Sequence, residues 1–155
     1  MNTNTIDSVI TKEAVTSFVD SLDPAVLRMS CKQNMLVNAG TSPDEMVQGL
    51  EYVRSAMEEF AEDDVFNPAG IGIVGMRAAV DLWDEHYDMF VDIATELTDV
   101  QVSDLSRNSA GIIERLKAGA ASFMGEEFSS SLQNLWGRML TVANGELLRR
   151  GLAIA

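Results

Sequence analysis

Four carboxylates in the middle of the chain have a spacing that could hold a metal ion. Glu59 and Glu62 are three residues apart, and Glu85 and Asp88 repeat that spacing after 22 intervening residues. Residues three apart lie about one turn from each other on a helix, so two such pairs on facing helices could surround Mg²⁺ with hard oxygen ligands. The sequence therefore offers a magnesium-dependent enzyme as one hypothesis.

The same four positions carry a family resemblance. Glu-x-x-Glu followed by Glu-x-x-Asp on two successive helices is similar to the pattern of all-α nucleoside triphosphate pyrophosphatases of the MazG kind, and the similarity covers only Glu59, Glu62, Glu85 and Asp88. The resemblance implies carboxylates that hold Mg²⁺ against a triphosphate. Apart from this alternative, the sequence predicts no cofactor and no catalytic residue.

Two other features could be mistaken for chemistry. Gly70 to Gly75 spells G-x-G-x-x-G, but the residues before it are acidic and turn-like instead of a buried strand. That context favours the first turn of a helix over a dinucleotide site. His86, the only histidine, shares an apolar helical stripe with Trp83 and Phe90, which predicts a buried, hydrogen-bonded side chain; a general base tuned by neighbouring carboxylates is the alternative. With Cys31 as the only cysteine, no structural zinc site can be assembled.

Negative charge is concentrated in one third of the chain. The net charge is −13, and residues 44–99 alone hold fifteen acidic and two basic side chains. Six carboxylates three and four residues apart predict one continuous stripe on a single helix: Asp81, Glu85, Asp88, Asp92, Glu96 and Asp99. The stripe is either a solvated face or a surface for a basic protein partner, with an acidic inhibitor or DNA mimic as the extreme case. Direct binding of nucleic acid is not expected.

The elements that must position these residues are helices, because apolar residues recur every three and four positions. Caps and periodicity predict helices over about 11–22, 24–39, 67–97, 103–124 and 126–150, with a further helix that begins at Pro43. Asp23 is the expected N-cap of the second helix and Gly40 its left-handed C-terminal cap, Ser42 and Glu45 are expected to form a capping box, and Gly151 is expected to stop the last helix. The expected fold is all-α, a compact bundle of five to six mostly antiparallel helices joined by short loops. Residues 11–155 are expected to form one helical domain after a flexible tail at 1–10.

Small residues predict a close-packing face on the helix expected at 103–124. Gly111, Ala118, Ser122 and Gly125 recur at intervals of seven, four and three, so they would line one side of that helix. A neighbouring helix or a second subunit could approach closely there.

These features together favour a non-enzymatic protein that acts through protein–protein interaction or assembly, with self-association into a homo-oligomer. In composition, the short acidic chain with small-residue helical faces resembles accessory proteins of tailed bacteriophages, including virion and ejection components. The sequence has no apolar run long enough to span a bilayer, so we expect no transmembrane segment. The expected location is cytoplasmic, or the virion if the protein is viral.

Overall fold

The regular elements of the structure, a computed structural model that describes residues 17–59, 78 and 80–154, are all helical. This confirms the predicted all-α fold class. Short helical segments cover residues 17–20 and 80–85. The remaining elements are α3 (Pro24–Ala39), α4 (Pro43–Glu59), α6 (Tyr87–Ala94), α7 (Asp99–Lys117), the 3-10 turn η1 (Ser122–Met124) and α8 (Glu126–Arg149). The predicted tail at 1–10, the glycine motif at 70–75 and the proposed ligand Glu62 lie outside the described residues.

Local capping chemistry sets several helix starts where the sequence predicts them. Asp23 caps α3 by accepting a hydrogen bond from the Ala25 N–H at 2.9 Å, with Pro24 in the first helical position. The Ser42 hydroxyl accepts from the Glu45 N–H at 3.1 Å, and the Glu45 carboxylate accepts from the Ser42 N–H at 3.4 Å. This reciprocal pair is the predicted capping box of α4.

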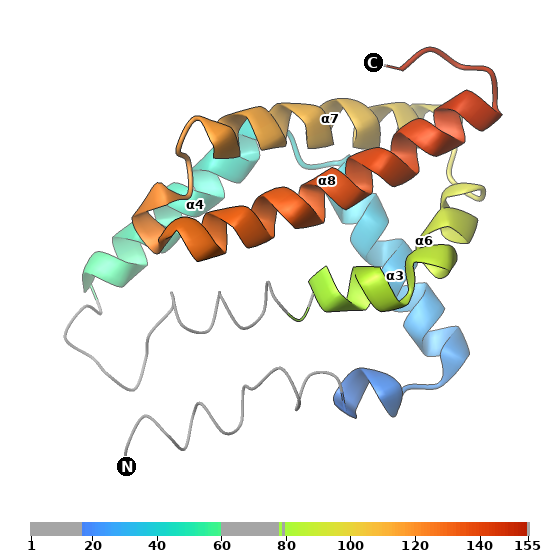
Figure 1. Cartoon of the computed structure of the whole chain (residues 1–155), viewed down its shortest axis with the longest axis horizontal. Helices are drawn as coiled ribbons and strands as arrows, with labels where there is room; N and C mark the ends of the chain where they lie inside the picture. Colours follow the sequence, from blue (N-terminus) through green and yellow to red (C-terminus); the bar gives the residue numbers. More distant parts are fainter. Residues whose placement is uncertain (1–16, 60–77, 79, 155) are drawn as a thin grey trace.

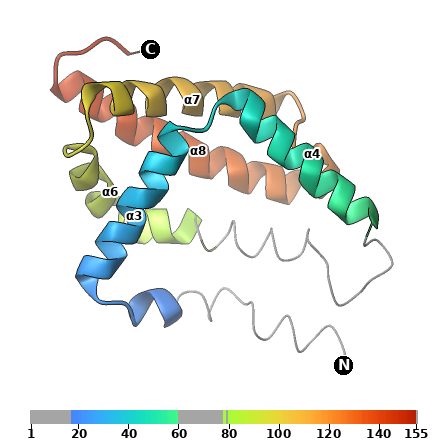
Figure 2. The ribbon, with the colours of Figure 1, turned by 180° about the vertical axis from the view of Figure 1, so that it is seen from behind.

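The longest helices, α7 and α8, form the frame of the molecule. They run antiparallel and side by side, and the chain reverses between them through η1 (Figure 1). Gly119 and Gly125 have φ angles of 103° and 96°, which L side chains rarely adopt, so both ends of this reversal require glycine. Figure 2 shows α3 crossing this frame steeply, and α4 beginning beside α7 and then running away from it at an angle.

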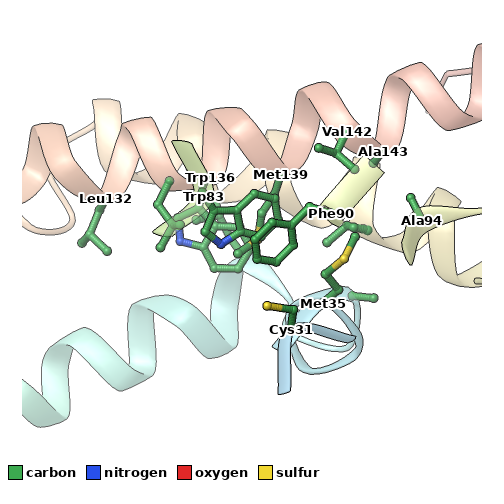
Figure 3. Packing of buried hydrophobic residues seen from close by; sticks show 14 of the residues in the cluster. Cys31, Met35, Trp83, Phe90, Ala94, Leu132, Trp136, Met139, Val142 and Ala143 are labelled. Atoms are coloured by element: carbon green, nitrogen blue, oxygen red, sulfur yellow. The ribbon is translucent and has the colours of Figure 1, made fainter. Parts of the chain in front are cut away.

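One cluster of buried side chains connects the described helices. It includes Met35, Phe90, Ile93, Leu105 and Leu147, each no more than 1 % exposed. The rings of Trp83 and Phe90 stack at its centre, with centroids 3.6 Å apart and planes 10° from parallel. Figure 3 shows Trp136 and Met139 of α8 beside this stack and Cys31 and Met35 of α3 beneath it.

The prediction of one continuous helix over 67–97 is wrong. His86 has φ −112° and ψ 28°, which interrupts the helix before α6, and α6 ends at Ala94 instead of Leu97. The Thr95 hydroxyl donates to the Asp92 carbonyl at 2.6 Å, and Thr98 starts the next helix by a capping box with Gln101. Side-chain hydrogen bonds of these two threonines therefore turn the chain where apolar periodicity alone would continue it.

Two glycine predictions differ in outcome. Gly40, expected to be a left-handed cap, has φ −88° and ψ 0°, so that prediction is wrong. The Thr41 hydroxyl donates to the Val37 carbonyl at 2.8 Å, which satisfies the helix end without a left-handed residue. Gly151 does adopt the left-handed conformation, with φ 71°, just after α8.

Among the described helices, none is both long and apolar enough for a bilayer crossing.

Candidate functional site

The six carboxylates predicted to form one helical stripe are divided among several elements. Asp81 and Glu85 precede the break at His86, Asp88 and Asp92 lie on α6, Glu96 lies in the following turn, and Asp99 begins α7. The prediction of a single continuous stripe is therefore wrong, for the same reason that the long helix is interrupted.

Arginines from distant parts of the chain form ion pairs with Asp92, Glu96 and Asp99. Arg28 of α3 pairs with Asp92 at 2.8 Å and also with Glu96. Arg150, just after α8, pairs with Asp99 at 2.8 Å. These ion pairs join elements far apart in the sequence, so much of the acidic segment binds its own chain.

A buried carboxylate that the sequence reasoning missed lies beside this second arginine. Glu146 of α8 is 5 % exposed and accepts hydrogen bonds from Arg149 Nε at 2.9 Å and Arg150 Nε at 2.7 Å. The Arg149 hydrogen bond is the main cause that lowers the pKa of Glu146 from 4.5 to about 2; burial opposes it, and Arg150 adds to it. The spacing of an acid three and four residues before two arginines was the available signal.

Arg150 also closes the end of α6. Its Nη2 donates to the carbonyls of Ala94 at 3.0 Å and Leu97 at 2.7 Å. Ala94 is the last residue of α6 and its carbonyl also accepts from the Leu97 N–H at 3.2 Å, whereas the Leu97 carbonyl lies in the loop before α7. Glu146 and Arg150 therefore act as a structural clamp that connects α6, α7 and α8.

The proposed metal ligands are not brought together within the described residues. Glu59, Glu85 and Asp88 are all exposed, and Glu62 is not among the residues described. In the described ranges, no group of three or more histidine, cysteine, aspartate or glutamate side chains could hold a metal ion. The magnesium hypothesis gains no support from this geometry.

His86 and Cys31 have different surroundings. His86 is only half-buried, and its Nε2 is buried without a hydrogen-bond partner among the described residues, so the predicted hydrogen-bonded core histidine is not observed. Cys31 is 3 % exposed, and burial raises the pKa of its thiol. A thiol of raised pKa is mostly protonated at neutral pH and therefore a weak nucleophile.

The small-residue face does not exist as a helical face. Ala118 caps the end of α7, Ser122 belongs to η1 and Gly125 precedes α8, so only Gly111 lies within the helix. The predicted helix over 103–124 is wrong because the chain leaves α7 after Lys117 and turns through Gly119. Gly111 itself packs inside the molecule: a Cβ there would lie 2.5 Å from Cγ of Pro43, the first residue of α4.

The α3 helix carries apolar side chains on two opposite sides. Its inner side buries four residues, Leu27, Cys31, Met35 and Ala39. At 100° per residue, the exposed Val26, Met29 and Val37 fall within an arc of about 80° centred on the opposite side. They are 42 %, 60 % and 64 % exposed. We call these three residues the outer α3 stripe.

The described residues thus form an all-α fold. Comparison with protein-family models, curated proteins and solved structures finds no match for the chain. Its function must therefore be inferred from the outer α3 stripe and the surrounding charges.

Proposed function

We propose that this protein acts by self-association, as a helical interaction or assembly component whose contact surface is the outer α3 stripe. The observation that carries the proposal is the pair of apolar sides on α3. A surface helix normally presents a polar side to solvent. Val26, Met29 and Val37 instead leave apolar area exposed along most of the length of α3.

The distribution of charge favours a second copy as the occupant of this stripe. Two chains of net charge −13 repel each other when their acidic surfaces approach. Residues 24–39 contain two basic side chains, Arg28 and Lys32, and no acidic one. In two copies that meet α3 to α3, these helices therefore bring no carboxylate against another carboxylate while they cover apolar surface. Such self-association is what an assembly component of the predicted kind requires.

The test is the molar mass in solution as a function of protein concentration, measured by sedimentation velocity. Met29→Glu should weaken self-association at least about tenfold, because the interface would bury an unpaired carboxylate. Leu148→Glu is the matched control, since Leu148 on α8 is 66 % exposed, is close to methionine in size and lies outside the stripe. The control should associate like the parent chain.

Salt separates this proposal from the acidic-partner hypothesis. Screening reduces repulsion between two acidic chains, so added salt should strengthen self-association through the stripe. Binding of a basic protein by the carboxylates should instead weaken with salt. A parent chain that stays monomeric at all concentrations and salt levels would refute the proposal, and so would loss of association only in Leu148→Glu.

A further inference from the structure

A large apolar cavity lies against the flank of α3 between its buried inner side and the outer α3 stripe. Its volume is about 520 Å³, within the range of small-molecule sites. Side chains from residues 17–22, α3, α4, the helical segment 80–85, α6 and α8 form its walls. The cavity therefore lies where separate helices converge, and its shape depends on their packing.

The described wall residues are mainly aromatic and aliphatic. Trp83, Phe90 and Trp136 contribute rings, and most of the other lining residues are leucine, valine, phenylalanine and methionine. Among the residues that the structure describes, none that lines the cavity is charged, although 23 % of the chain is. An anionic ligand would meet no cation among these described wall residues and would enter a protein of net charge −13. The lining thus selects a neutral, largely hydrocarbon molecule.

Polar atoms are gathered on one side of the cavity, on α3. Asn38 Nδ2 donates to Asn34 Oδ1 at 3.0 Å and lies 3.0 Å from Sδ of Met139. Within the described part of the chain, these bonds leave the side-chain N–H groups of Asn34 and the side-chain oxygen Oδ1 of Asn38 available to a ligand. A few polar atoms beside an apolar wall are typical of sites that orient a ligand with one polar end.

We propose that this cavity binds a neutral amphiphile, with its hydrocarbon part against Trp83, Phe90 and Trp136 and its hydroxyl or carbonyl group at Asn34 and Asn38. This site uses other residues than the outer α3 stripe, on a side of α3 centred about 115° away from it around the helix axis. The two tryptophans of the chain both line it, so indole emission reports directly on occupancy.

Decan-1-ol, decanoate and 10-bromodecan-1-ol are the probes, used with the full chain. Decan-1-ol should shift the indole emission in a saturable way, and decanoate should bind at least about tenfold more weakly. 10-Bromodecan-1-ol should quench the emission with the same saturation curve as decan-1-ol, because a heavy atom quenches an indole only on close contact. Equal affinity for decanoate would overturn the assignment to a neutral ligand.

A pair of serine variants locates the site. Ser30 of α3 is exposed and lines the cavity, whereas Ser130 of α8 is exposed and does not. Ser30→Phe should weaken the binding of 10-bromodecan-1-ol, measured from its quenching curve, at least about tenfold. Ser130→Phe should leave this affinity unchanged. Circular dichroism of both variants checks that each is folded. Unchanged quenching in a folded Ser30→Phe variant would overturn the proposal. Indole emission that changes with protein concentration alone would also overturn it, because a second copy would then fill the cavity.

Discussion

Glu146 provides the sharpest test of how the acidic chain is held together. Its carboxylate is buried and bonded by Arg149 and Arg150, and its pKa is lowered from 4.5 to about 2. That difference corresponds to about 3 kcal/mol of free energy of unfolding when the group is ionised in both states. Because the Arg149 side chain is 60 % exposed, water screens part of the interaction, and about 2 kcal/mol is the expected loss in Glu146→Gln at pH 7.

The sign of the pH dependence follows from the lowered pKa. A carboxyl group with a lower pKa in the folded state stabilises the protein above its unfolded pKa, here about 4.5, and loses that contribution as the pH falls toward 2. The stability difference between the parent chain and Glu146→Gln should therefore be constant from pH 7 to about 5. It should shrink between about pH 4.5 and 2.

Urea unfolding followed by circular dichroism at a series of pH values measures this difference directly. Other carboxylates titrate in both chains and cancel in the comparison. Glu114→Gln on α7 is the matched control, because Glu114 is exposed and its side chain forms no ion pair among the described residues. If the gap between the parent chain and Glu146→Gln did not narrow below pH 4.5, the clamp would not be the source of its stability.

The remaining predictions concern single contacts and use the same unfolding assay. Gly111→Ala should lower the free energy of unfolding by about 1 to 2 kcal/mol, because the new Cβ would lie 2.5 Å from Pro43 Cγ. Gly145→Ala in α8 should instead raise the free energy of unfolding by about 0.5 to 1 kcal/mol, because its new Cβ would meet no neighbouring atom within 4 Å. Equal effects of the two alanines would contradict the close approach of α7 to α4. Ser42→Ala should cost about 1 kcal/mol by removing the cap of α4, and no loss would mean that the capping box contributes nothing to stability.

Local chemistry explains why the fold class and several helix starts could be read from the sequence. Asp23 and Ser42 cap their helices through atoms two or three residues away, and a proline follows each cap. The start of α8 after Gly125 is equally local, because a φ of 96° excludes continuation of a helix. Such interactions are complete within one turn, so no tertiary contact is needed to predict them.

Helix ends and faces were less predictable where competing local signals met. Apolar periodicity continues through residues 86–97, yet the conformation of His86 and the hydrogen bonds of Thr95 and Thr98 divide that region. The small-residue face predicted after Gly111 likewise required the helix to continue to Gly125, but α7 ends at Lys117. Periodicity predicts a face only when the backbone stays helical throughout.

The sequence by itself determined the helical character of the chain, the capped helix starts and the concentration of acid in residues 44–99. Only the tertiary structure decided how that acid is used, because Arg28 is 68 residues away from Glu96 and Arg150 is 51 residues away from Asp99. It also decided which side of α3 is buried, since both sides are apolar in sequence. Pairing across such distances depends on how the helices pack, which residue spacing within one helix does not encode.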